Sequence, residues 1–356
     1  MRLISLTKSL EGNSNYTGFK GELVSIPLVG VAVHDGINAG GTILTEQAEL
    51  NRNGVDNIVR NSNFQFTQNG TSWTGNAGND YISDGWYMQH GGGSTSNAAQ
   101  VTTYEPLLNQ STYLRVTTFT GGASNSFSLL SQRYSRLVKY TGQELTISYW
   151  VKSNVTTSLS GECGLSFADA GTADRKTLIN RVTLQANTWQ KVEQTFTVPA
   201  ISNSDVIDDT QDHMYIYFWL DAGDDFNDRT GGILPFSGTF DIGNIKVEYG
   251  SQATAYNTMS YRDEEKKVHE YYEKRTRNQF LSSSGTSTHA TTTIGNFEFK
   301  NAKWSDLPTV TYSATFISGD SIFSRDAYGF TLIGTATEVA SSARISEYIA
   351  NAEIAP

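Results

Sequence analysis

One segment of the sequence, HMYIYFWLDA at residues 213–222, carries aromatic side chains at the alternate positions 215, 217 and 219. Residues two apart in a strand point to the same face, so Tyr215, Tyr217 and Trp219 would share one face. Flat aromatic rings stack on the apolar C–H faces of sugar rings, so the spacing indicates a glycan-binding platform. The same stripe also suits a core or an oligomer interface. Trp150 faces away from the aliphatic side of its own strand and would join the platform if both strands belong to one sheet.

Acidic side chains are concentrated around this segment. Glycosidases use two carboxylates about 5–10 Å apart across the scissile bond. The residues that could supply such a pair are Asp205, Asp208, Asp209, Asp212, Asp221, Asp224, Asp225 and Asp228. All lie in loop-like segments, where solvated acids are the simpler interpretation. The chain has no G-x-S-x-G motif and only five scattered histidines, so we expect no enzymatic activity.

Four of these acids lie close together in the segment DAGDDFND. Asp221, Asp224, Asp225 and Asp228 offer the hard oxygen ligands that calcium prefers, but their spacing is not that of an EF-hand loop. The segment could hold a structural Ca²⁺, and the sequence calls for no other cofactor. A catalytic transition metal is not expected, because the histidines do not cluster.

A second candidate recognition surface lies near the C-terminus, in SGDSIFSRDAYG at residues 318–329. If this segment is a loop, it exposes Phe323, Arg325 and Tyr328, and aromatic and Arg side chains are frequent anchors of binding surfaces. The alternative is an ordinary hairpin connection in which Phe323 is buried.

Composition excludes several classes of partner. The chain has 356 residues and a net charge of −10, which disfavours the phosphate contacts on which nucleic-acid binding depends. No apolar run approaches the roughly 20 residues of a membrane span. The segment MRLISLTKSL lacks the long apolar region of a signal peptide, so we expect no export by that route. The single cysteine, Cys163, is expected to be an inert strand residue.

Alternating apolar and polar residues predict an all-β protein. The clearest example is ELTISYWVKS at 144–153, and Gly- and Asn-rich turns separate such runs. The one convincing helix starts near Ser260, with Asp263 placed to complete an N-cap. We therefore predict a small N-terminal β domain, a jelly-roll β-sandwich, a helical linker and a C-terminal β-sandwich, with boundaries at 1–50, 51–256, 257–280 and 281–356.

Several motifs, in this order, resemble phage tail fibre proteins. The segment GFKGELVSIPLVGVAVHDGINAGG resembles the small β domain that opens many phage tail fibres and major tropism determinant proteins, at Gly21, Glu22, Leu23, His34, Asp35, Gly36, Gly40 and Gly41. The middle resembles the carbohydrate-binding-module-like jelly roll of phage tail proteins, at Asn63–Phe64, Gly70–Trp73, Asp84–Tyr87, Thr146–Ser153 and 238–256. The last part resembles the terminal sandwich of such fibres, at 307–313, 327–330 and 351–354. In this reading Trp73 and Trp86 are structural.

The resemblance implies a virion protein of the phage tail, usually a homotrimer, that engages a bacterium. Its partners would be further copies of itself, other tail proteins and a bacterial surface polysaccharide, bound without cleavage. Jelly-roll carbohydrate modules often hold a structural calcium through an acid on the last strand, and Asp241 stands at a comparable place. Two alternatives remain open, namely a tail-associated polysaccharide-degrading enzyme and a structural adaptor without receptor binding.

Overall fold

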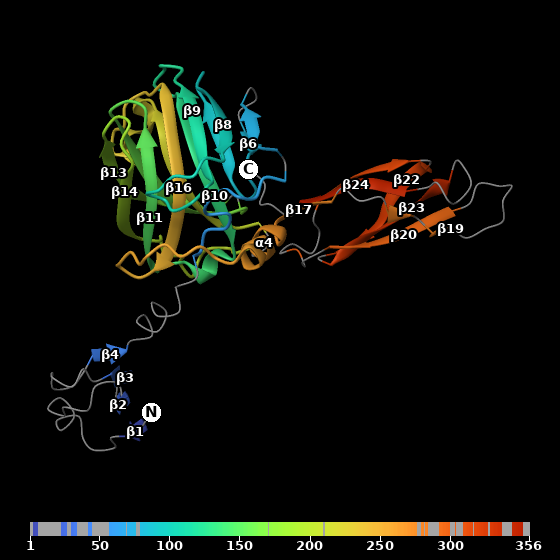
Figure 1. The fold of residues 1–356 in the computed structure, drawn as a ribbon, viewed down its shortest axis with the longest axis horizontal. Coiled ribbons are helices and arrows are strands. Elements are labelled where there is room, and N and C mark those ends of the chain that lie inside the picture. Colours follow the sequence, from blue (N-terminus) through green and yellow to red (C-terminus); the bar gives the residue numbers. More distant parts are fainter. Residues whose placement is uncertain are drawn as a thin grey trace.

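The computed structural model describes residues 57–275, except 69, 76–78, 170, 209 and 210. Outside this range it describes residues 3–5, 23–26, 30–33, 42–44, 279–280, 282–283, 292–299, 303, 309–315, 317–326, 328–336 and 344–351. The described chain is nearly all β, which confirms the predicted fold class (Figure 1).

The N-terminal strands form one four-stranded sheet in sequential order. They are β1 (Leu3–Ser5), β2 (Leu23–Ile26), β3 (Gly30–Val33) and β4 (Thr42–Leu44). β1 pairs with β2 in parallel, and the other two pairs are antiparallel. The His34–Gly36 motif and its neighbouring glycines at 21, 40 and 41 lie outside the described residues.

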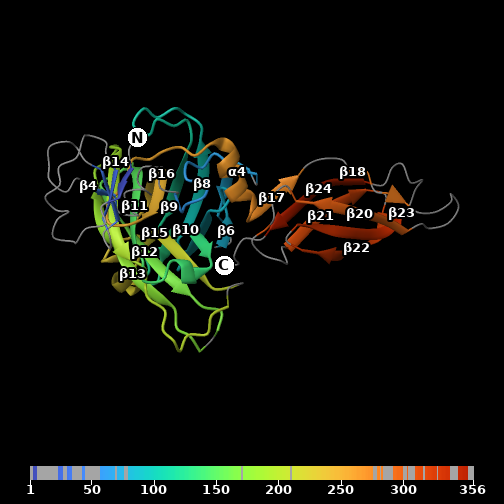
Figure 2. The ribbon, with the colours of Figure 1, turned by 90° about the horizontal axis from the view of Figure 1, so that it is seen from below.

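Two six-stranded sheets pack face to face and form the predicted jelly roll (Figures 1 and 2). The first, here called the β15 sheet, has the order β13 (Arg175–Leu184), β12 (Thr157–Ser166), β15 (His213–Ala222), β10 (Phe127–Ser135), β7 (Tyr87–Gly91) and β6 (Asn79–Tyr81). The second, the β16 sheet, has the order β14 (Gln190–Thr197), β11 (Glu144–Ser153), β16 (Gly238–Tyr249), β9 (Tyr113–Phe119), β8 (Thr95–Val101) and β5 (Ser72–Thr74).

The core between the two sheets follows the alternation seen in the sequence. The inward residues of three strands are buried, namely Leu145, Ile147, Tyr149, Val151, Val192, Phe196, Met214, Ile216, Phe218 and Leu220. Each such side chain contributes about 1.5–3 kcal/mol when it leaves water. Trp86 is fully buried in this core, and its Nε1 donates to the Asn61 carbonyl oxygen at 3.0 Å. The structural role predicted for Trp86 is thus confirmed, and Trp73 packs half-buried at the edge of the same core.

A short helix, α4 (Tyr261–His269), follows the jelly roll. Its N-cap is the predicted Ser260, whose side chain accepts a hydrogen bond from the Asp263 backbone N–H. The helix covers less of the chain than the predicted 257–280 linker, because residues from Tyr272 onward pair as a strand. The helix lies against the jelly roll, where Lys267 Nζ donates to the Asn57 carbonyl oxygen at 2.9 Å.

The C-terminal strands form two four-stranded sheets around a small aromatic core (Figure 2). One contains β17 (Tyr272–Arg275), β24 (Arg344–Asn351), β18 (Gln279–Phe280) and β21 (Thr309–Thr315). The other contains β19 (Ser282–Ser283), β20 (Thr292–Glu298), β23 (Gly329–Ala336) and β22 (Ile317–Arg325).

The junction between jelly roll and C-terminal sheets is built from buried polar contacts. The side-chain amide of Gln68 accepts from the Lys274 backbone N–H at 3.0 Å and donates to the Tyr272 carbonyl oxygen at 3.3 Å. Lys303 Nζ, fully buried, pairs with Glu273 at 2.8 Å and donates to the His269 carbonyl oxygen. β17 is therefore held both by β24 and by the jelly roll.

Candidate functional site

The outer face of the β15 sheet carries the aromatic stripe predicted from the sequence. Met214, Ile216, Phe218 and Leu220 point into the core, so Tyr215, Tyr217 and Trp219 point outward together. The rings of Tyr215 and Tyr217 stack with centroids 4.1 Å apart and planes 23° apart, and Tyr217 remains half-buried. We call this outer surface the tyrosine face.

Strand register arranges the tyrosine face in three transverse rows. The first row is Gly164, Tyr215 and Arg133; the second is Glu162, Tyr217, Ser131 and Tyr87; the third is Ser160, Trp219, Leu129 and Gln89. Neighbouring strands lie about 4.8 Å apart, so the second row spans about 14 Å across four strands. Acidic, aromatic and hydroxyl groups therefore alternate along this row, in which Glu162, Ser131 and Tyr87 are buried and Tyr217 is half-buried.

A buried ion pair fixes one end of the second row. Glu162 has no exposed surface and accepts two hydrogen bonds from Arg229, at 2.8 Å from Nε and 2.6 Å from Nη2. The Tyr215 hydroxyl donates to the same carboxylate at 2.9 Å. Burial, and then the neighbouring Glu162 charge, raise the pKa of Tyr215 strongly, so its hydroxyl stays protonated as a donor. Arg229 comes from the short helix α3 (Asn227–Thr230), which lies over β12 and β15.

The sequence reading missed Glu162, Arg229 and Tyr87. Glu162 alone left a trace in the sequence, since it is a charged residue inside the otherwise uncharged run SLSGECGLS. Such an acid in a buried strand requires a partner. The identity of that partner depended on a loop fold that no local pattern predicts.

Three buried polar atoms of the tyrosine face have no hydrogen-bond partner among the described residues. They are the Tyr87 hydroxyl, Ser160 Oγ and Trp219 Nε1. Burial raises the pKa of Tyr87 to about 12, so its hydroxyl also remains a donor. A buried polar group without a partner costs about 1–3 kcal/mol, a cost that a bound water, ion or ligand removes.

Two of the predicted platform residues offer no stacking surface on the tyrosine face. Trp219 is only 1% exposed, because Phe226, Ile233 and Phe127 cover its ring and the Arg229 guanidinium lies 4.9 Å from its centroid. Its ring faces are therefore not open for stacking on a sugar. Trp150 lies on β11 in the β16 sheet, so it cannot join Tyr215 and Tyr217 in one platform.

The structure does not bring the predicted calcium ligands together. Asp221 is buried and accepts hydrogen bonds from the Ser94 hydroxyl at 2.6 Å and the Phe236 backbone N–H at 2.7 Å. Asp228 is exposed and pairs with Lys176, while Asp224 and Asp225 lie on the short turn before α3.

Asp241 is also no calcium ligand here, because it lies on β16 and both its oxygens are paired with cations. No group of three or more metal-ligating His, Cys, Asp or Glu side chains occurs in the described part of the chain. The predicted calcium ligands are therefore corrected to separate acids that do not converge on one site, of which Asp221, Asp228 and Asp241 have partners of their own.

The predicted C-terminal recognition loop at 318–329 is mostly strand. β22 runs to Arg325, and Asp326 Oδ1 closes a tight turn by accepting from the backbone N–H groups of Tyr328 and Gly329. Arg325 and Tyr328 are exposed as predicted, the latter by 71%, whereas the side chain of Phe323 lies outside the described residues.

The Asp326 turn lies at the end of the C-terminal sheets that adjoins the jelly roll. Gly329 pairs with Glu298, and the Tyr348 hydroxyl contacts both the Glu298 carbonyl oxygen and the Glu273 carboxylate in β17.

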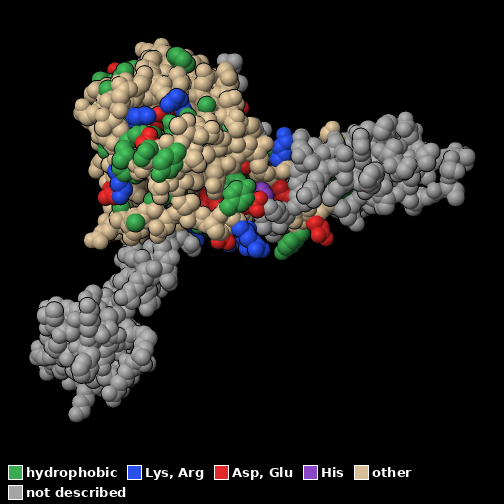
Figure 3. All heavy atoms as spheres, viewed as in Figure 1, with side chains coloured by type: hydrophobic (Ala, Val, Ile, Leu, Met, Phe, Trp, Pro, Cys, Tyr) green, Lys and Arg blue, Asp and Glu red, His purple; other side chains and the backbone are tan. Residues whose placement is uncertain are grey.

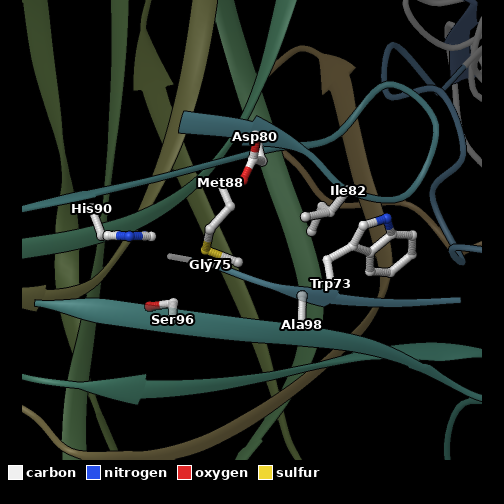
Figure 4. A pocket seen from close by; sticks show the side chains of 8 residues that line it. All are labelled: Trp73, Gly75, Asp80, Ile82, Met88, His90, Ser96 and Ala98. Carbon is white, nitrogen blue, oxygen red and sulfur yellow. The ribbon is translucent and has the colours of Figure 1, made fainter. Parts of the chain in front are cut away.

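A small cavity lies at the edge where β5 and β8 meet β6 and β7 (Figure 4). Its volume is about 10 Å³, and it is lined by Trp73, Gly75, Asp80, Ile82, Met88, His90, Ser96 and Ala98. Burial lowers the pKa of His90, so its ring is neutral at pH 7. That volume suits about one water molecule and no sugar, so this is a packing feature.

Comparison with known proteins finds no matching family model and no match among curated proteins. Several solved structures are similar to part of the chain. The CBM22-2 xylan-binding domain from Paenibacillus barcinonensis Xyn10C is 16% identical, with a TM-score of 0.30 over 47% of this chain and 92% of its own. A family 22 carbohydrate-binding module of Clostridium thermocellum Xyn10B is 15% identical, with a TM-score of 0.32 over 54% of this chain and 100% of its own.

A phage protein is also among these structures. The enzymatically active domain of bacteriophage CBA120 tailspike protein 4 is 14% identical, with a TM-score of 0.31, and the match covers 55% of this chain and 21% of that one. No helix in the described part of the chain is long and apolar enough to cross a membrane.

Proposed function

We propose that the tyrosine face binds a glycan without cleaving it. One observation carries this proposal: the stacked Tyr215 and Tyr217 lie in the first two rows of the face, and three buried polar atoms without partners among the described residues lie in the second and third rows. The half-buried Tyr217 ring, backed by Tyr215, supplies an apolar surface for a sugar ring, and the Tyr87 hydroxyl and Ser160 Oγ supply donors for its oxygens. Glu162 is held rigid by Arg229 and orients the Tyr215 ring beside them.

The composition of the face favours binding over hydrolysis. Glycosidases need two carboxylates on opposite sides of the scissile bond. Glu162 is the only carboxylate in the three rows, and its oxygens are already bound by Arg229 and Tyr215. A polysaccharide-degrading enzyme would require a second acid that these rows do not supply.

We further propose that the chain is a phage tail fibre protein, trimeric in the virion, whose jelly roll binds bacterial surface polysaccharide. The ordered motifs of the sequence support this, as does the succession of N-terminal sheet, jelly roll and C-terminal sheets. Three copies would raise the effective affinity of a weak site through local concentration. Light scattering tests the assembly, and a mass near the single-chain 39.1 kDa would contradict it.

The glycan proposal is tested by replacing Tyr217. The intact protein is first applied to an array of bacterial surface glycans, and the best ligand is then titrated by calorimetry. The Tyr217→Ala variant should bind this ligand about 10-fold or more weakly, because it loses the stacking surface. Tyr104→Ala is the matched control, since Tyr104 is an exposed tyrosine in the turn between β8 and β9.

Unchanged affinity in Tyr217→Ala would reject the tyrosine face as the site. Loss of mass from the bound polysaccharide on incubation would favour the enzyme. Absence of binding to host cells together with attachment to tails would favour a structural adaptor.

A further inference from the structure

The outer face of the opposite sheet, the β16 sheet, carries an open polar pocket. Its volume is about 280 Å³, near the lower limit of ligand pockets at about 300 Å³. Its lining comes from β9, β11, β16 and two flanking turns, and consists of Arg115, Lys152, Asn154, Asn187, Thr239 and Asp241. Figure 3 shows hydrophobic side chains gathered beside Lys and Arg side chains on the face that this sheet presents.

The pocket floor carries more positive than negative charge. Asp241 is nearly fully buried and binds Arg115 through two hydrogen bonds of 2.7 and 2.9 Å. Lys152 Nζ lies 3.1 Å from the same carboxylate. Two cations thus share one acid, although the whole chain has a charge of −10. The side chains of Arg115 and Lys152 are 45% and 25% exposed, so both remain accessible from the pocket.

Aromatic rings border these cations. Lys152 Nζ lies 4.8 Å from the centroid of the Trp189 ring, and Tyr113 meets the same ring edge-on at 5.4 Å. Trp189 Nε1 is buried and has no hydrogen-bond partner among the described residues. Trp150, half-buried, stands two residues before Lys152 on the same outer face of β11. Trp150, which the sequence analysis placed with Tyr215 and Tyr217, therefore lies beside this pocket instead.

We propose that this pocket is a second binding site, which takes an acidic saccharide through its carboxylate. The Lys152 ammonium and the Arg115 guanidinium would neutralise the carboxylate, and the amides of Asn154 and Asn187 would bond ring hydroxyls. Trp189 would pack against the apolar side of the sugar. The site lies on the sheet opposite the tyrosine face, so it does not depend on glycan binding there.

The test uses the full chain and a matched pair of ligands. A trimer of galacturonic acid is titrated by calorimetry beside its methyl ester, which keeps the ring and linkage but removes the charge. The free acid should bind, the ester should bind at least about 10-fold more weakly, and binding should weaken as salt is added. Equal binding of acid and ester, or binding of neither, would overturn the proposal.

Substitutions locate the bound ligand. Lys152→Gln should weaken binding of the trimer by about 10-fold or more, since a charged hydrogen bond is lost while the Arg115–Asp241 pair keeps the floor intact. Lys176→Gln removes the same charge from the other sheet and should leave affinity unchanged, as should Tyr217→Ala. A thermal melt checks that each variant is folded.

Two results would count against the site in different ways. Loss of binding in Tyr217→Ala with full binding in Lys152→Gln would place the acidic saccharide on the tyrosine face instead. Inorganic phosphate that binds as tightly as the trimer would reduce the pocket to an anion site without saccharide recognition.

Discussion

The outer faces of the two jelly-roll sheets each carry an acid paired with an arginine, yet they use it differently. On the tyrosine face, Glu162 and much of Arg229 are covered, and the pair positions an aromatic surface. On the β16 sheet, one covered acid, Asp241, is shared by Lys152 and by Arg115, whose side chain is 45% exposed, so surplus positive charge is available to a ligand. The comparison indicates that a second cation on the same acid, more than the presence of an ion pair, separates a binding pair from a structural one.

The largest expected effect distinguishes the two acids by stability. Glu162→Gln leaves the Arg229 charge poorly solvated, since its side chain is only 26% exposed, so unfolding free energy should fall by about 2–3 kcal/mol. Asp241→Asn leaves Arg115, which binds Asp241 through two hydrogen bonds, 45% exposed and open to hydration, and should lower it by about 1 kcal/mol. Urea denaturation followed by circular dichroism measures both. Equal losses of unfolding free energy in the two variants would contradict the distinction between a structural and a binding ion pair.

A smaller effect should appear in the pH dependence of stability. His213, on β15 beside Tyr215, has a pKa lowered from 6.5 to about 4, first because it is buried. The folded chain thus keeps this ring neutral while the unfolded chain takes up a proton below about pH 6.5. Stability is therefore lost as pH falls from about 6.5 to 4, by about 1–2 kcal/mol given that solvent reaches part of the ring.

The His213→Gln variant isolates this contribution. The difference in unfolding free energy between the native chain and the variant should fall across that pH window, whereas other titrating groups cancel. No described residue of the outer β16 face is a histidine, so an equivalent dependence is not expected there. A flat difference would show that His213 is solvated in the folded chain.

The smallest effect concerns two hydroxyls on the tyrosine face. Tyr87→Phe removes a buried hydroxyl without a partner and should raise the unfolding free energy by up to about 1 kcal/mol. Tyr215→Phe removes the hydrogen bond to Glu162 and should lower it by about 1 kcal/mol. Thermal unfolding of both variants gives the two signs, and a loss of stability in Tyr87→Phe would mean that this hydroxyl is already satisfied.

Local pattern predicted the strands and their inward faces, because burial on one side of a pleated strand leaves a period of two. Residues 144–153 and 213–222 follow that rule closely. Pattern could not predict which strands share a sheet, since the order β13-β12-β15-β10 depends on crossovers between distant segments. This is why Trp150 was assigned to the wrong surface.

The site was predicted less well than the fold for a similar reason. The closely spaced acids at 221–228 suggested a calcium site. The Asp221 carboxylate instead accepts hydrogen bonds from the Ser94 hydroxyl and the Phe236 backbone N–H, which come from elsewhere in the chain. Residues 318–329 were predicted as a loop, but most of them pair with β23 as strand β22. Both predictions, the calcium site and the C-terminal loop, failed because residues distant in the sequence pair with these segments.

The two hydrogen bonds that Gln68 makes to β17 have a consequence for solubility. β17 is an edge strand, and an edge with unsatisfied N–H and C=O groups invites pairing with strands of other molecules. A side-chain amide that bonds the backbone of Tyr272 and Lys274 imitates the next strand and ends the ladder there. The jelly roll thus covers part of the edge of the C-terminal sheets. A C-terminal fragment that begins after α4 would expose this edge, and we expect that fragment to aggregate.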